Sequence, residues 1–168
     1  IMNRLEKAAR HHTIQASNIT RLHKYRRILF VSNADSTRGP MAAELLRHMD
    51  LLQEYRIGSR GLVVLFPEPA NQKAEAIMRS KQMTLASHEA TPLTEDDLDD
   101  ETLVITFEEA QKWKIAANFE NVKNVHTLSE YIDDERVVES SMGQPLQVYG
   151  SNFELLQELI IKLAEKLN

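Results

Sequence analysis

The sequence predicts an α/β protein in which a parallel sheet lies between layers of helices. Short apolar runs rich in strand-forming residues alternate with segments whose apolar residues recur at helical spacing. The run Ile28–Val31 is unbroken, as is typical of a strand buried on both faces. Strands that alternate with helices imply a parallel sheet with helices on both faces. We therefore expect a three-layer fold with four parallel strands.

The length of the chain fits one globular domain, and its negative net charge argues against a polyanionic partner. The chain has 168 residues, of which 42% are hydrophobic, and a formal net charge of -5. A negative net charge disfavours nucleic acid and anionic membranes as partners, and no apolar stretch approaches the length of a membrane span. We see no signal peptide and expect a cytoplasmic protein.

Cysteine is absent, which excludes disulfides, thiolate metal sites and thiol catalysis. The six histidines are scattered, and the adjacent pair His11 and His12 does not have the spacing of metal ligands on a helix. We therefore expect neither a metal nor a cofactor.

Residues 1–24 precede the first predicted strand and form a predicted helical extension, so that the domain proper spans residues 25–168. The extension carries only a thin apolar stripe. This favours a tail or a surface helix on its own domain. The alternative is an arm that docks on a partner or on a second copy, which would make a homodimer.

A polar loop, Ser32–Arg38, follows the first strand and reads S-N-A-D-S-T-R. Gly39 and Pro40 come next, and proline is well placed at the start of a helix. In a strand–loop–helix segment, successive backbone N–H groups converge and the helix N-terminus adds partial positive charge. The guanidinium of Arg38 suits a bidentate grip on phosphate. The alternative is an ordinary turn with a solvated Arg38.

The other elements are assigned in chain order. Helices are predicted over residues 41–49, 70–81, 108–119 and 151–168, and strands over 55–61, 102–107 and 122–128. A capping box, Ser151-x-x-Glu154, predicts the start of the last helix, and Thr94 is predicted to cap a short acidic helix. Residues 133–150 are the longest irregular segment, a kind of loop that is often functional.

From about Arg26 onward the chain resembles the low-molecular-weight protein tyrosine phosphatase family. The phosphate loop of that family reads V-C-x-G-N-x-C-R-S-P, and this chain reads V-S-N-A-D-S-T-R-G-P. The S-x-G that ends at Gly61 and the L-T-E-D-D segment that ends at Asp97 match as well. The resemblance implies the phosphotyrosine protein phosphatase I-like fold, a four-stranded parallel sheet flanked by helices. It also implies that the loop after the second strand, with the run Leu62–Phe66, forms one wall of the substrate cleft.

The family hydrolyses phosphoesters with a loop cysteine as nucleophile and an aspartate before a late proline as general acid. On this resemblance Ser32 occupies the nucleophile position, where a hydroxyl gains no useful alkoxide from the field that ionises a thiol. Gln144 stands before Pro145 at the general-acid position, and an amide cannot donate a proton as an acid. Asp133, Asp134 and Glu139 are alternative acids in the same loop.

Two further replacements in the loop bear on phosphate binding. Asp35 stands where the family has asparagine, and at about 5 Å and a dielectric of about 20 its charge would repel each unit of phosphate charge by roughly 3 kcal/mol. That repulsion is avoided if Asp35 points away or pairs with Arg38. Ala34 replaces a glycine, which costs about 1 kcal/mol if the position needs a positive φ.

We expect a phosphatase-like protein with a degenerate loop that binds phosphate or a phosphorylated side chain and is catalytically impaired. The predicted phosphate ligands are Ser32, Asn33, Ala34, Asp35, Ser36, Thr37 and Arg38. Two alternatives stay open: an active phosphotyrosine phosphatase that uses Ser32 or an activated water, and a non-catalytic dimer or scaffold protein.

Overall fold

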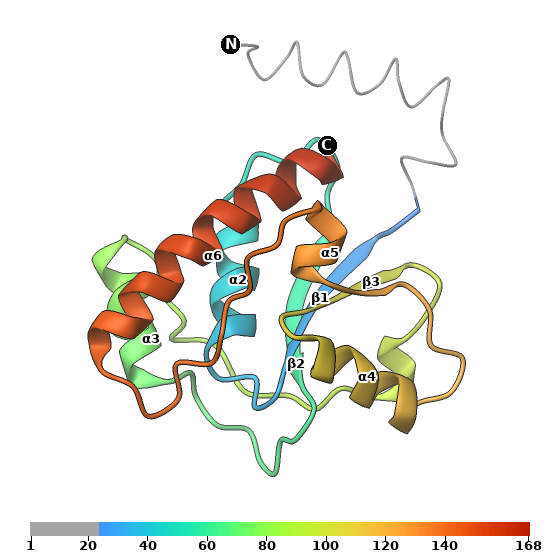
Figure 1. The fold of residues 1–168 in the computed structure, drawn as a ribbon, viewed down its shortest axis with the longest axis horizontal. Helices are drawn as coiled ribbons and strands as arrows, with labels where there is room; N and C mark the ends of the chain where they lie inside the picture. The colour runs from blue at the N-terminus through green and yellow to red at the C-terminus, as the bar shows by residue number, and fades with distance from the viewer. Residues whose placement is uncertain (1–23) are drawn as a thin grey trace.

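A computed structural model describes residues 24–168, which form a four-stranded parallel sheet in the order β2-β1-β3-β4 (Figure 1). The strands are β1 (Arg27–Ser32), β2 (Arg56–Gly61), β3 (Thr102–Thr106) and β4 (Val125–Thr127). Every neighbouring pair is parallel, which confirms the predicted α/β fold. The predicted extension lies, apart from residue 24, outside the described residues.

The helices alternate with these strands. They are α2 (Arg38–Arg47), α3 (Gln72–Ser80), a 3-10 turn η1 (Glu95–Asp97), α4 (Glu109–Asn118), α5 (Leu128–Ile132) and α6 (Leu146–Leu167). Within residues 24–168 no helix combines the length and the apolar character needed to cross a bilayer.

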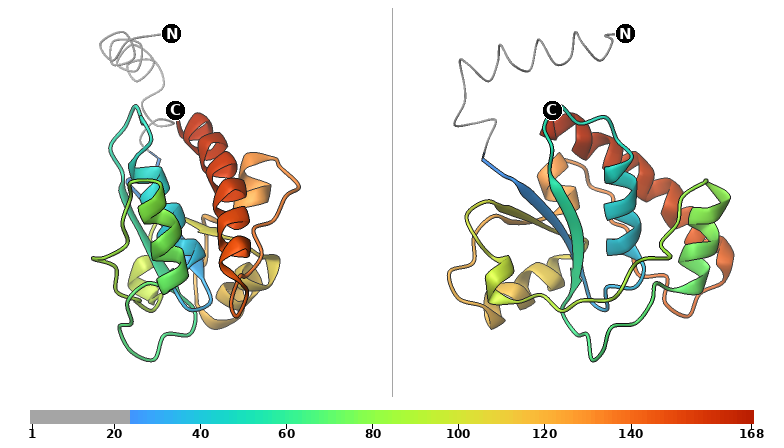
Figure 2. Two further views of the ribbon diagram at one scale, coloured as in Figure 1. Left: turned by 90° about the vertical axis from the view of Figure 1, so that its left-hand side faces the viewer. Right: turned by 180° about the vertical axis from the view of Figure 1, so that it is seen from behind.

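Two separate apolar cores show that helices cover both faces of the sheet. Successive strand residues point to opposite faces. Ile28 and Phe30 of β1 belong to the larger core, which also holds the buried residues of α2 and α6. Val31 of β1 belongs to the smaller core, together with Ile115 of α4. The three predicted layers are therefore present, and Figure 2 shows them from two further sides.

The last helix begins earlier than the capping box predicted. Pro145 is the N-cap of α6, and the hydroxyl of Ser151 donates to the carbonyl of Gln147 inside the helix. Gly150 lies inside α6, and a Cβ at this position would stand in ordinary van der Waals contact, 3.6 Å from Ile77 Cδ1 of α3. The predicted start at Ser151 was wrong, and the irregular segment is residues 133–145.

The other boundaries differ by a few residues. Helix α2 begins at Arg38, so Pro40 lies in its first turn, where a missing N–H costs no helical hydrogen bond. Strand β4 is shorter than predicted because the hydroxyl of Thr127 caps α5 by accepting from the N–H of Glu130. The cap at Thr94 is confirmed, since its N–H donates to Asp97 Oδ2 at 3.0 Å.

The loop after β1 lies at the carboxyl edge of the sheet, on the lower side of Figure 1. The chain leaves β1 for β2 on one side and later enters β3 on the other. Ligand sites of open parallel sheets form at such a switch point. The fold therefore places the predicted anion loop where a ligand site is expected.

Asp97 of η1 joins the first two strands of the sheet through two arginines. Its Oδ1 lies 2.9 Å from Arg27 Nη2 of β1, and its Oδ2 lies 3.2 Å from Arg60 Nε of β2. Burial alone would raise the pKa of Asp97. The N–H of Thr94 and the two guanidinium groups together outweigh burial and hold the pKa below its usual value.

We predict that Asp97→Asn lowers the free energy of unfolding by about 1–3 kcal/mol near neutral pH, because a buried hydrogen-bonded charge is lost. A lowered folded-state pKa gives stability that is present above the unfolded pKa and lost as pH falls through the folded pKa. The difference between the variant and the parent should therefore shrink in acid. Urea unfolding at several pH values measures this difference in the free energy of unfolding. Asp96→Asn, at an exposed position in the same turn, is the control. A pH-independent difference would contradict the ion-pair explanation.

Candidate functional site

The loop after β1 turns its carbonyl groups outward. The oxygens of Ser32 and Asn33 accept hydrogen bonds from the N–H groups of Leu62 and Val63 at 3.0 and 2.8 Å. Further along, the oxygens of Ser36 and Thr37 accept from the N–H groups of Asn71 and Met41 at 2.9 and 3.0 Å. The neighbouring segments therefore fix the direction of each of these peptide groups.

The N–H groups of the same loop are left unpaired. None of the backbone N–H groups of residues 33–37 donates a hydrogen bond to another residue of the described part of the chain. Backbone donors away from water are normally paired. Because the carbonyl groups face outward, these N–H groups lie on the inner side of the loop, as in an anion-binding nest.

A hollow lies on that inner side and has a volume of about 40 Å³. One water needs roughly 10–15 Å³ by the same kind of measure, so the hollow admits a group of several heavy atoms. The loop contributes Ser32, Asn33, Ala34, Ser36, Thr37 and Arg38, and the late segment contributes Ser140, Ser141 and Met142. All of the predicted phosphate ligands except Asp35 thus come together here.

Asp35 points away from the hollow. Its backbone is left-handed, with φ 55, and its side chain is buried at 0% exposure. The carboxylate Oδ2 accepts from the N–H of Thr91 at 2.9 Å, and His88 Nε2 donates to the Asp35 carbonyl at 2.6 Å. Of the two ways to avoid repulsion, the structure uses the outward orientation, and Asp35 does not pair with Arg38.

Burial raises the pKa of Asp35. The hydroxyl of Ser59, the N–H of Thr91 and the charges of His88 and Arg60 oppose that rise without cancelling it. Oδ1 has no hydrogen-bond partner of standard geometry among the described residues, although Ser59 lies close enough to affect the pKa. The aspartate therefore carries an energetic cost that an uncharged side chain would not have.

Arg38 is held firmly and is not solvated. It is 6% exposed, and its Nη1 donates to the carbonyl of Val138 at 2.9 Å. Nη2 lies 3.1 Å from Glu108 Oε2, and the guanidinium carbon lies 5.5 Å from the centre of the Phe107 ring. The side chain thus links the loop to the end of β3 and to the late segment.

The late segment differs from the prediction that Gln144 faces the loop. Gln144 is exposed and does not line the hollow, and its carbonyl accepts from Lys73 Nζ at 2.8 Å. Ser140 and Ser141 lie there instead. The physical reason is that Pro145 caps α6, so the Gln144–Pro145 pair belongs to the start of that helix. The role of Gln144 as the general-acid position stays a prediction.

No carboxylate lines the hollow, so far as residues 24–168 describe it. The three alternative acids, Asp133, Asp134 and Glu139, are not among the lining residues. Asp134 pairs with Lys162 at 2.6 Å and with Arg136 at 3.1 Å. In the same part of the chain no group of three or more histidine, aspartate or glutamate residues could hold a metal ion.

An apolar rim runs beside the loop. The segment 62–66 is tied to the loop by its first two N–H groups, and Val63, Leu65 and Phe66 are exposed, Leu65 to 87%. Met142, a lining residue of the hollow, is exposed as well. The run Leu62–Phe66 therefore presents apolar side chains to solvent beside the loop.

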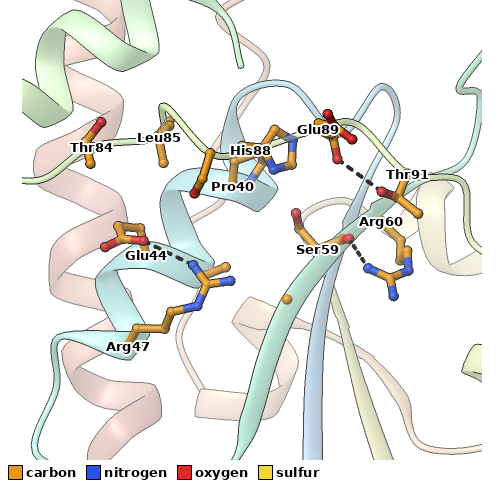
Figure 3. A pocket seen from close by; sticks show the side chains of 13 residues that line it. Pro40, Glu44, Arg47, Ser59, Arg60, Thr84, Leu85, His88, Glu89 and Thr91 are labelled. Atoms are coloured by element: carbon orange, nitrogen blue, oxygen red, sulfur yellow. Dashed lines mark hydrogen bonds and ion pairs between the residues drawn. The ribbon is translucent and has the colours of Figure 1, made fainter. Parts of the chain in front are cut away.

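A larger cavity of about 390 Å³ lies behind the loop (Figure 3). Its lining includes His88 and Thr91, which hold Asp35 from outside. Its two arginines are engaged: Arg47 bonds Glu44 at 3.1 Å, and Arg60 donates to the carbonyl of Ser59 at 2.7 Å. This cavity therefore supports the loop from outside.

Comparison with known proteins agrees with this geometry. The profile of the low molecular weight phosphotyrosine protein phosphatase family matches residues 27–168. The chain belongs to this family. It is 29% identical over 143 residues to a protein-arginine-phosphatase of Geobacillus stearothermophilus, covering 84% of this chain and 95% of that protein. It is 26% identical over 140 residues to the low molecular weight protein-tyrosine-phosphatase PtpB of Staphylococcus epidermidis, covering 83% and 98%.

Solved structures show the same relationship. The low molecular weight protein tyrosine phosphatase from T. tengcongensis superposes with a TM-score of 0.77 at 29% identity, covering 83% of this chain and 98% of that one. A cysteine-to-serine mutant of the YwlE arginine phosphatase, with a phosphorylated active-site serine, superposes with a TM-score of 0.77 at 28% identity, covering 84% and 95%.

We predict that Asp35→Asn raises the free energy of unfolding near neutral pH by about 1 kcal/mol, the lower end of the cost of an unsatisfied buried group. A raised folded-state pKa gives stability that is complete below the unfolded pKa and lost as pH rises through the folded pKa. Asparagine does not titrate, so its advantage should appear at neutral pH and vanish in acid.

Urea unfolding of both proteins between about pH 4 and pH 8 measures this difference. Asp96→Asn, on the exposed side of η1, is the control for removing one negative charge. A variant less stable than the parent at neutral pH would mean that the charge of Asp35 is stabilised by His88 and Arg60 beyond its burial cost.

Proposed function

We propose that this chain binds the phosphoryl group of a phosphorylated protein side chain in the loop Ser32–Arg38 and is catalytically impaired. The observation that carries the proposal is the set of backbone N–H groups of residues 33–37, none of which has an acceptor among the described residues. Phosphate oxygens are suitable acceptors for such a set. The guanidinium of Arg38 at the same hollow adds positive charge.

The surroundings of Ser32 support impaired catalysis. Its hydroxyl accepts and donates no hydrogen bond within the described residues, so no side chain is positioned there to remove its proton. A serine needs such an adjacent base. The hydroxyl groups of Ser140 and Ser141 line the opposite side and are poor acids for an ester leaving group.

An active phosphatase is the second candidate, and one comparison favours it. In the YwlE mutant the active-site serine carries a phosphoryl group, so a serine in this fold can be the acceptor. In the same step here, the Ser32 oxygen would form a bond to phosphorus as the bond to the leaving group breaks. The serine proton would pass to the leaving group. Turnover would then require water to cleave the phosphoserine.

Phosphate binding can be tested by titrating the ¹⁵N-labelled chain with inorganic phosphate. We expect the amide resonances of residues 33–37 to shift together, with millimolar or tighter affinity. Arg47→Ala removes an arginine that lies outside the hollow and should leave these shifts unchanged. Arg38→Ala should weaken the binding by about 10-fold or more, because a charge-assisted hydrogen bond is lost. Shifts spread over the surface, or none, would remove support for a phosphate site.

Catalysis can be tested by turnover of an aryl phosphate. We expect the parent to match Ser32→Ala, and Ser32→Cys to exceed both, because a thiolate forms readily in this field. Mass spectrometry after incubation reports whether Ser32 becomes phosphorylated. Turnover by the parent that is lost in Ser32→Ala would establish the active phosphatase in place of the binding protein.

A further inference from the structure

One buried hydroxyl in the hollow has no partner in the structure. Ser141 is 2% exposed and lines the hollow, and its Oγ makes no hydrogen bond to any described residue. Asp35 and Gln111 also have an unpartnered buried atom, but each has another side-chain atom that is bonded. Ser141 has only this one polar side-chain atom. Buried hydroxyl groups are normally paired, so this one needs an explanation.

The position of Ser141 is fixed by its neighbours. Arg38 Nη1 binds the carbonyl of Val138, which ties the late segment to the phosphate loop. The N–H of Gln144 donates to the carbonyl of Ser141 at 2.9 Å and closes a turn. The backbone of Ser141 is therefore held against the hollow, while its hydroxyl hydrogen is free to rotate toward an acceptor.

We propose that Ser141 is a ligand of the bound phosphoryl group and donates its hydroxyl hydrogen to one of the phosphoryl oxygens. This rests on the proposed function. The N–H groups of residues 33–37 reach the phosphoryl group from the loop, and Ser141 supplies a donor from the opposite wall of the hollow. The cost of an unpartnered hydroxyl then exists only in the empty protein and is relieved when the ligand arrives.

A hydroxyl in this wall also favours retention of the ligand. A carboxylate there would repel a phosphate dianion, whereas a neutral donor stabilises it. A hydroxyl cannot protonate a leaving group effectively at neutral pH. The residue that strengthens binding therefore adds nothing to ester cleavage, which agrees with a protein that holds a phosphorylated side chain.

Ser151 provides a control outside the hollow. It is exposed and does not line the hollow, and its hydroxyl donates to the carbonyl of Gln147 at 3.1 Å. Ser151→Ala removes one hydroxyl from the same part of the chain without touching the site. Only the loss at Ser141 should therefore affect the ligand.

The experiment compares the full chain with Ser141→Ala, Ser141→Thr and Ser151→Ala by calorimetric titration with inorganic phosphate and by thermal unfolding without phosphate. We expect Ser141→Ala to weaken phosphate binding by about 5- to 10-fold, the effect of one hydrogen bond to a charged group. Its melting temperature without phosphate should be equal to or above that of the parent. Ser141→Thr should keep most of the affinity, and Ser151→Ala should bind like the parent.

Two results would overturn the proposal and separate its failure from that of the proposed function. If the parent binds phosphate and Ser141→Ala binds equally well, the loop is a phosphate site and Ser141 is no ligand. If Ser141→Ala melts at a lower temperature with unchanged affinity, the hydroxyl has a structural role. If the parent binds no phosphate, the proposed function fails and this proposal fails with it.

Discussion

The arrangement of peptide groups in the loop Ser32–Arg38 is the constraint on which the rest of the site depends. The carbonyl groups are held outward by segments far apart in the sequence: the exit from β2, the start of α3 and His88. Each outward carbonyl leaves the following N–H on the inner side. The side chains of the loop contribute less to this shape than the elements packed around it, because the bonds that define it are made by the backbone.

That dependence on backbone explains how the loop tolerates its unusual side chains. Asp35 adopts the left-handed conformation and sends its carboxylate outward to the N–H of Thr91, so its charge is removed from the hollow. Ser32 keeps the position at the end of β1 without any catalytic partner in the described chain. The direction of the loop's peptide groups is therefore kept, although Ser32 and Asp35 stand where the family has cysteine and asparagine.

The sequence predicted the elements and the loop, because both leave local signals: apolar runs, helical spacing and a polar turn between them. It failed in the late segment. The capping box predicted the start of the last helix at Ser151, although Pro145 caps α6 and the helix begins at Leu146. Irregular segments carry no periodicity, and their partners are chosen by tertiary contacts. The isolated hydroxyl of Ser141 could be found only from the folded chain.

The contact between Arg38 and Glu108 gives the empty site an internal counter-ion. A carboxylate oxygen at 3.1 Å already occupies one nitrogen of the guanidinium, so an incoming oxyanion meets a cation that is partly neutralised. For the oxyanion that we propose as ligand, binding would then exchange one anionic partner of the guanidinium for another. Such an exchange would lower the affinity for weakly charged solutes and favour ligands that engage the backbone donors at the same time.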